Sequence, residues 1–245
     1  CRVTVGPISY ETKKVHPIVL TRENMEVPLA LAGGAGEASL VKQAYRLCEK
    51  IFYEMALREW SLKTPEFEQF EEAVNNVESA LINRLRRLRE EGISPNFSMI
   101  LAGVSPSGKA SIYLFDERGL AEPVHNNPGF AVIGTGFFTG GNLLLRLLGY
   151  EPETSFTLDL GALTTFIIDV VSEIDPAVGP FIGECYFMRV EEGEVKLGPL
   201  KEIAIKEYKE KSRQRKELIR RLWRLFDHIG ENEVLKVVQE LEAKE

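Results

Sequence analysis

A change of hydrophobic period near residue 38 constrains the fold more than any other feature of the sequence. Residues 1–34 contain β-branched, roughly alternating runs that are typical of strands. Over residues 38–60 the apolar residues instead recur at helical spacing, and a second helical stripe follows over 64–92. Thr64-Pro65 predicts the start of the second helix, with an N-cap hydroxyl before a proline. Two amphipathic helices in tandem can cover one face of a sheet.

The rest of the chain repeats this alternation of strands and helices. We predict an α+β protein with a four-layer α/β/β/α sandwich, in which helix pairs flank antiparallel sheets. The expected strands are 98–105, 110–117, 128–136, 183–190 and 194–198, and the expected helices are 143–148 and a longer one from Thr157 to Asp175.

A charge-dense tail follows this region. Residues 206–245 carry leucines, isoleucines and valines at helical spacing, and Gly230 divides them into two helices. We therefore expect one domain over residues 1–205 and a C-terminal helical extension over 206–245. We expect the extension to pack on a neighbouring subunit and give a homo-oligomer, since its charges alternate in sign and it has an apolar stripe.

Composition excludes several classes of partner. The 245 residues carry a formal net charge of −7, which argues against nucleic-acid and anionic-membrane binding. No apolar run approaches the roughly 18 to 20 residues of a membrane span, and no secretory signal is visible. The odd cysteine count predicts a reducing, cytoplasmic environment. Abundant Lys, Arg, Glu and Leu hint at a thermophilic source.

Cys1 is the first candidate for chemistry. An N-terminal cysteine combines a thiol with an α-amine, whose pKa of about 7.7 to 8.0 lets it accept the thiol proton near neutral pH. Such a residue is a nucleophile with its own base. Cys1 is equally consistent with an ordinary strand residue at a truncated or renumbered terminus.

Four further residues are candidates for the same site. Gly33 and Gly34 stand where a strand gives way to a helix, so their amides can stabilise an oxyanion, although a tight turn accounts for them equally well. Lys14, or its neighbour Lys13, can lower the pKa of a nearby thiol, although most lysine pairs are merely solvated. Asp175 can orient an amine, although an Asp-Pro turn is its commoner role.

Metal and cofactor sites lack a sequence signal. The chain has no C-x-x-C, no H-E-x-x-H and no acidic loop of the calcium type, and the glycines at 33–36 lack a dinucleotide or P-loop motif. We expect no cofactor. Scattered carboxylates remain open as metal ligands.

The order of elements and five motifs resemble a proteasome β subunit, of the N-terminal nucleophile (Ntn) hydrolase superfamily, over roughly residues 1–200. The resemblance rests on PLALAGGAGEASLV, ILAGVSPSGKASIYLFDERG, FAVIGTGFFTGG, SFTLDLGALTTFIIDVV and IDPAVGP, in the family's order. It implies the sandwich fold.

The resemblance also assigns roles. It implies that Gly33 is the oxyanion-hole glycine, that Lys14 is the lysine that tunes the nucleophile, and that Asp175 supports the terminal amine. Phe137 and Val178 stand where the family has serines.

The start of the chain allows two registers. In one, CRVTVGP resembles the family's segment just after its second strand, so that Cys1 lies beyond the nucleophile position. In the other, Cys1 replaces the family's threonine after a shortened first hairpin. We adopt the second.

The leading hypothesis is therefore an Ntn-type amidohydrolase or peptidase. The Cys1 thiolate attacks an amide carbonyl, Gly33 with Gly34 stabilises the oxyanion, Lys14 keeps the thiolate ionised and Asp175 orients the amine. One alternative is a catalytically silent assembly or binding protein of the same fold. Another is a metal-dependent hydrolase in which acidic residues do the work.

Overall fold

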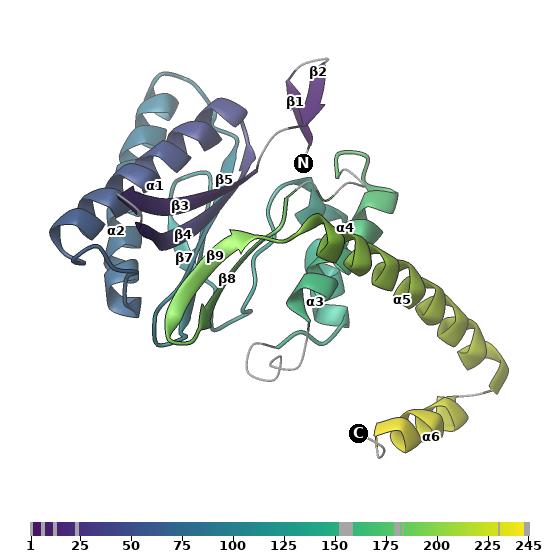
Figure 1. Cartoon of the computed structure of the whole chain (residues 1–245). Coiled ribbons are helices and arrows are strands. Elements are labelled where there is room, and N and C mark those ends of the chain that lie inside the picture. The colour runs from purple at the N-terminus through teal and green to yellow at the C-terminus, as the bar shows by residue number, and fades with distance from the viewer. Residues whose placement is uncertain are drawn as a thin grey trace.

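A five-stranded antiparallel sheet lies at the centre of the structure. The structure is a computed structural model, and it describes residues 2–5, 8–11, 14–22, 25–151, 159–178, 182, 184–229 and 231–242. The strands of this sheet follow one another in chain order, so each connection is a hairpin or a helical excursion (Figure 1). They are β3 (Val15–Arg22), β4 (Met25–Gly36), β5 (Phe97–Val104), β6 (Ala110–Phe115) and β7 (Ala121–Pro123).

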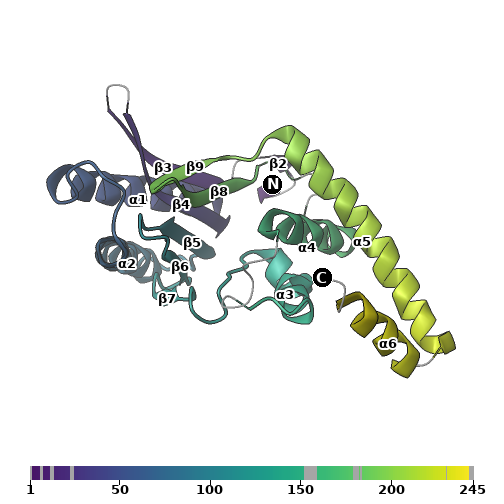
Figure 2. The ribbon, with the colours of Figure 1, turned by 60° about the horizontal axis from the view of Figure 1, so that its bottom comes forward.

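Two long helices, α1 (Ala38–Arg58) and α2 (Phe67–Glu90), cover one face of the sheet (Figures 1 and 2). Side chains alternate between the faces of a strand, and the buried members of β5 and β6 pack beneath these helices. Phe52 of α1 and Phe115 of β6 are fully buried in this core. The tandem helix pair is confirmed.

The start of α2 differs from the predicted Thr64-Pro65. Glu66 is the N-cap, because its side chain accepts from the backbone of Gln69 while the Gln69 side chain accepts from the Glu66 N–H at 2.9 Å. This reciprocal capping box satisfies two backbone donors at once, and it places the first helical residue at Phe67.

On the opposite side of the sheet lie η1 (Phe137–Gly141), α3 (Asn142–Leu147) and α4 (Leu160–Ile174). The predicted strand over 128–136 is wrong: residues 130–133 are irregular, and none of the described strands pairs with them. Thr157, expected to cap the next helix, lies outside the described residues, and Asp159 caps α4 by accepting from the Ala162 N–H at 3.1 Å.

Two hairpins complete the strands. They are β1 (Arg2–Val5) with β2 (Ile8–Glu11), and β8 (Tyr186–Glu191) with β9 (Glu194–Pro199), and each is a separate two-stranded antiparallel sheet. The second hairpin lies against β4 and β5 (Figure 2). The α+β class with antiparallel sheets is therefore confirmed. Among the described residues these hairpins are separate two-stranded sheets, so the four-layer sandwich stays a prediction.

The C-terminal extension begins earlier than predicted. Helix α5 (Glu202–Ile229) starts before residue 206, and α6 (Glu231–Glu242) follows it. The first half of α5 packs on α4 of the same chain, where Lys216 pairs with Asp169 at 2.6 Å and Ser212 donates to the same carboxylate at 2.7 Å. Burial raises the pKa of Asp169, but the hydrogen bonds from Lys216 and Ser212 outweigh it and lower that pKa overall.

The remainder of the extension projects from the body as an arm, which is the second half of α5, from Leu218 onward, together with α6 (Figures 1 and 2). None of the described helices has the length and hydrophobicity needed to cross a membrane.

Candidate functional site

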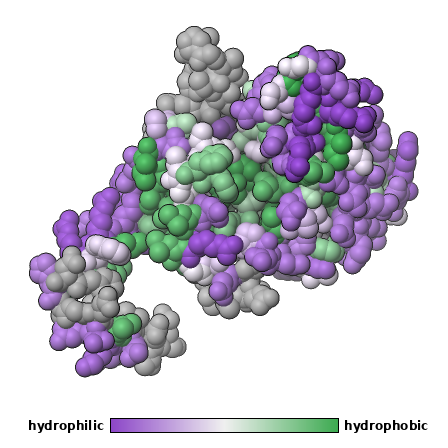
Figure 3. Space-filling model, turned by 180° about the vertical axis from the view of Figure 1, so that it is seen from behind, coloured by the Kyte–Doolittle hydropathy of each residue, from purple (hydrophilic) through white to green (hydrophobic). Residues whose placement is uncertain are grey.

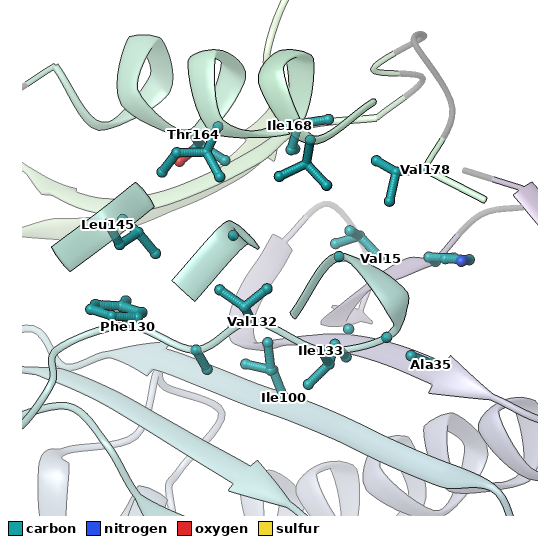
Figure 4. Close-up of a pocket in the computed structure, with 18 of the residues that line it drawn as sticks. Val15, Ala35, Ile100, Phe130, Val132, Ile133, Leu145, Thr164, Ile168 and Val178 are labelled. Atoms are coloured by element: carbon teal, nitrogen blue, oxygen red, sulfur yellow. The ribbon is translucent and has the colours of Figure 1, made fainter. Parts of the chain in front are cut away.

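An apolar cavity of about 600 Å³ separates the five-stranded sheet from α4. Ile100 lines it from the sheet, Ile168 lines it from α4, and Val132 lines it from the irregular segment that follows Phe130 (Figure 4). Volumes of 300 to 1,000 Å³ are usual for sites that bind small molecules. The cavity is therefore large enough for a ligand.

The alternation of β5 explains the apolar lining. Residues 97, 99, 101 and 103 of this strand are buried toward the helices, and the residues between them are half-buried on the other face. Ile100 and Ala102 consequently reach the cavity, as does Ile112 from β6. The same alternating pattern that makes the core leaves an apolar face on the far side of the sheet.

Lys14 lies directly before β3 and also lines the cavity. Its carbonyl oxygen accepts from the Gly34 N–H at 3.2 Å and from the Tyr45 hydroxyl at 2.5 Å, which tie this residue to β4 and α1. Burial lowers the pKa of the Lys14 ammonium. No carboxylate among the described residues lies within salt-bridge distance of it. Lys14 is thus half-buried, and none of the carboxylates in the described part of the chain pairs with its amine.

Gly33 and Gly34 face opposite sides of β4. A Cβ at Gly34 would lie 2.4 Å from Val41 Cγ1, so this position faces α1. Because successive residues of a strand alternate, Gly33 faces the cavity, where the nearest atom to an added Cβ is the Lys14 carbonyl oxygen at 3.9 Å. Both glycines line the cavity, Gly34 through its backbone.

The amides of these glycines point along the sheet. The Gly34 N–H donates to Lys14, which makes Val15 and Gly33 a non-hydrogen-bonded pair. The Gly33 N–H is therefore directed toward β5, where Ile100 is its register partner. The oxyanion-hole role of these amides, which the resemblance implies, stays a prediction.

The two glycines supply a matched pair of variants. We expect Gly34→Ala to lower the free energy of unfolding by roughly 1–3 kcal/mol, because its methyl group meets Val41 and Tyr45. Gly33→Ala has room for its methyl group, and we expect its stability to stay within about 0.5 kcal/mol of the parent. Denaturant unfolding measures both. Equal losses for the two variants would contradict the assignment of faces.

Asp175 ends α4 and is 6% exposed. Its carboxylate accepts from the Ala177 N–H at 2.8 Å and from the Thr139 hydroxyl at 3.0 Å. The hydrogen bond from Ala177 is the largest cause of the lowered pKa of this carboxyl. Asp175 itself does not line the cavity, but Ala177 and Val178 do. Its observed contacts connect η1 to the turn after α4.

Cys1 and Lys13 lie outside the described residues. Of the other cysteines, Cys48 is buried in the core, where burial raises the pKa of its thiol to about 12. Cys185 is half-buried, and burial raises its pKa as well. Neither has the environment of an activated thiol.

The structure therefore brings together Lys14, Gly33 and Gly34, and it places Asp175 two residues from the cavity lining. Sequence reasoning missed the other polar groups of the lining, which are Thr135, Tyr150, Thr164 and Glu184. They come from four separate segments, and Thr135 and Thr164 lie within two of the motifs quoted for the resemblance without having been singled out as site residues. No group of three or more His, Cys, Asp or Glu side chains that could hold a metal ion occurs among the described residues, so the metal-dependent alternative has no ligand set there.

No protein-family model matches the chain, and no curated protein is significantly similar to it.

Proposed function

We propose that this protein is an Ntn-type hydrolase that cleaves amide bonds, with Cys1 as the nucleophile and the apolar cavity as the site for the acyl part of the substrate. The observation that carries the proposal is the convergence of Lys14 and Gly33 on one cavity. A half-buried cation beside a position without a side chain suits a thiolate and an approaching carbonyl. The proposal requires that Cys1 have a free α-amino group in the active protein.

The reaction has two steps. The Cys1 amine accepts the thiol proton, and the thiolate forms a C–S bond to the amide carbon. The C–N bond then breaks, and the departing amine takes the proton from the α-ammonium. In the second step water adds to the thioester, the C–S bond breaks, and a carboxylic acid leaves while the thiol is restored.

Lys14 has two tasks in this scheme. Its ammonium favours the ionised thiol, and it stabilises the oxyanion of the tetrahedral intermediate. Gly33 contributes chiefly through the room that it leaves beside the Lys14 carbonyl. Asp175 acts through the turn that it holds, because its carboxylate already accepts from Ala177 and Thr139.

The acyl-enzyme is the direct test. The full chain is mixed with aminocoumarin amides of acyl groups and peptides, quenched in acid and examined by intact mass and peptide mapping. We expect release of the aminocoumarin and a thioester adduct on Cys1. Amine release without an adduct on Cys1, or no release from any amide in the series, would overturn the proposal.

A catalytically silent binding protein is the second candidate. It is favoured by the hydrogen bonds that already occupy the Gly34 amide and the Asp175 carboxylate. Ligand binding in the cavity without turnover of any amide would select this alternative.

We also propose that the hairpins β1–β2 and β8–β9 belong to the second sheet layer of an α/β/β/α sandwich, and that the chain forms a homo-oligomer through its arm. The arm exposes Leu218, Leu222, Trp223 and Leu225 of α5. Residues 211–224 carry seven Lys or Arg against one Glu, whereas α6 carries four Glu against one Lys. Two arms packed antiparallel would place basic α5 against acidic α6.

A hydrophobic area also lies on the back of the body (Figure 3).

Removal of residues 218–245 tests the arm. The shortened chain loses the exposed Arg220–Glu173 pair but keeps Ser212 and Lys216, which contact Asp169 of α4, so we expect it to fold but to lose oligomeric mass by light scattering. Leu222→Asp should have the same effect, because it places a charge in the exposed apolar stripe. Leu57→Asp, at an exposed leucine of α1, is the matched control and should leave the mass unchanged. An unchanged mass for the shortened chain would contradict the arm's role.

A further inference from the structure

We propose that the cavity binds a long, apolar carboxylic acid or its amide, with the chain of the ligand against the sheet and its carboxylate or carbonyl at Lys14. The inference deepens the proposed function and rests on it for the cleavage step: it names the substrate as an amide of a long-chain carboxylic acid. The binding step stands by itself.

The shape of the cavity is the first argument. Val15, Ala35 and Val178 lie at one end of it, and Phe130 and Leu145 lie at the other, with apolar side chains from the sheet and from α4 between them (Figure 4). An elongated apolar space of about 600 Å³ suits an alkyl chain better than a compact polar molecule. Burial of the chain supplies about 0.8 kcal/mol per methylene group, so longer chains should bind more tightly.

The charge of the cavity is the second argument. Lys14 is the cation among the described lining residues, and it adjoins Val15 at the end of the cavity away from Phe130. Glu184 is the carboxylate among them. Burial lowers the pKa of the Lys14 ammonium, and none of the carboxylates in the described part of the chain pairs with it. A half-buried ammonium next to an apolar space is complementary to one anionic head group on an apolar chain.

The position of the head group follows from the sheet. Gly33 faces the cavity next to the Lys14 carbonyl oxygen, and it presents no side chain. A carbonyl carbon can therefore approach β4 closely at this point. In the proposed reaction the same place holds the amide carbon before cleavage and the product carboxylate after it.

Calorimetric titration of the full chain with dodecanoate, below its micelle concentration, tests the site. We expect one dodecanoate per chain and weaker binding of octanoate. Lys14→Met should lower the affinity for dodecanoate about 10- to 100-fold and leave the affinity for dodecanol unchanged, because the alcohol lacks the charge. Ala102→Phe fills the cavity and should abolish both. Lys50→Met, at an exposed lysine, and Ala110→Phe, at an exposed alanine, are the matched controls and should change neither.

The outcomes separate this inference from the proposed function. If dodecanoate binds in the cavity and dodecanoyl aminocoumarin is not hydrolysed, the ligand inference is supported and the hydrolase proposal is overturned. If acetyl and dodecanoyl amides are hydrolysed at equal rates and dodecanoate does not bind, the ligand inference is overturned and the hydrolase proposal is supported. Dodecanoate affinity that Lys14→Met and Ala102→Phe leave unchanged would also overturn the inference.

Discussion

Replacement of Cys1 by alanine is expected to lower kcat/KM for amide hydrolysis by about 1,000-fold or more, because it removes the sulfur that bonds to the substrate in the proposed reaction. The residual rate would come from binding and from Lys14 alone. Far-ultraviolet circular dichroism and the midpoint of thermal unfolding of the variant are measured beside its activity, so that a loss of chemistry is distinguished from a loss of folding.

The other cysteines provide the matched controls for this variant. Cys185→Ala removes a half-buried thiol of raised pKa, and we expect full activity. Cys48→Ala removes a core side chain and should cost stability rather than chemistry, because the Cys48 sulfur lies 3.9 Å from Met99 Sδ in the buried core. Activity that survives in Cys1→Ala but is lost in Cys185→Ala would transfer the nucleophile to Cys185.

Lys14→Met is expected to lower kcat/KM by about 10- to 100-fold. The reason is that the ionised fraction of the Cys1 thiol falls tenfold for each unit by which its pKa rises. Stability should not fall with it. Burial penalises the Lys14 charge, so an apolar side chain of similar length removes that cost, and the midpoint of thermal unfolding should stay equal or rise. Lost activity with retained stability distinguishes a functional lysine from a structural one.

The pH profile of activity for the same variant provides a second test of the role of Lys14. The proposed reaction needs the Lys14 ammonium, so the activity of the parent should fall as pH rises through the lowered Lys14 pKa, below the usual lysine value of about 10.4. Lys14→Met should lack this alkaline limb and should shift the acid limb upward, because its thiol ionises less readily. Profiles that superimpose after scaling would rule out Lys14 as the group that tunes the thiol.

The parts of the fold that could be predicted are those in which one periodic pattern decides the structure. The stripes of α1 and α2 are long, and their bounds came within a few residues because amphipathic spacing persists over many turns. The start of α2 was missed since Glu66 and Gln69 cap each other more completely than Thr64-Pro65 would. Residues 130–133 were mistaken for strand because a β-branched apolar run also suits an irregular segment beside a cavity.

The candidate site was predictable only in part. Lys14, Gly33 and Gly34 could be grouped because they flank one hairpin, and the register of β3 with β4 brings them together. The cavity could not be predicted, since Phe130, Tyr150 and Thr164 reach it from segments far apart in the chain, and the motifs that contain Phe130 and Thr164 do not indicate that these side chains meet. The contacts of Asp175 follow from its own turn, and they match the simpler of the two roles considered for it.

The central proposal is that Cys1 is an activated nucleophile that works together with Lys14. The measurement that tests it most directly is the rate of alkylation of each cysteine by iodoacetamide at neutral pH, followed by peptide mapping. The account predicts that Cys1 reacts far faster than Cys185 and Cys48, that dodecanoate protects it, and that Lys14→Met slows it. A Cys1 that reacts no faster than a free thiol, and that dodecanoate and Lys14→Met leave unaffected, would contradict it.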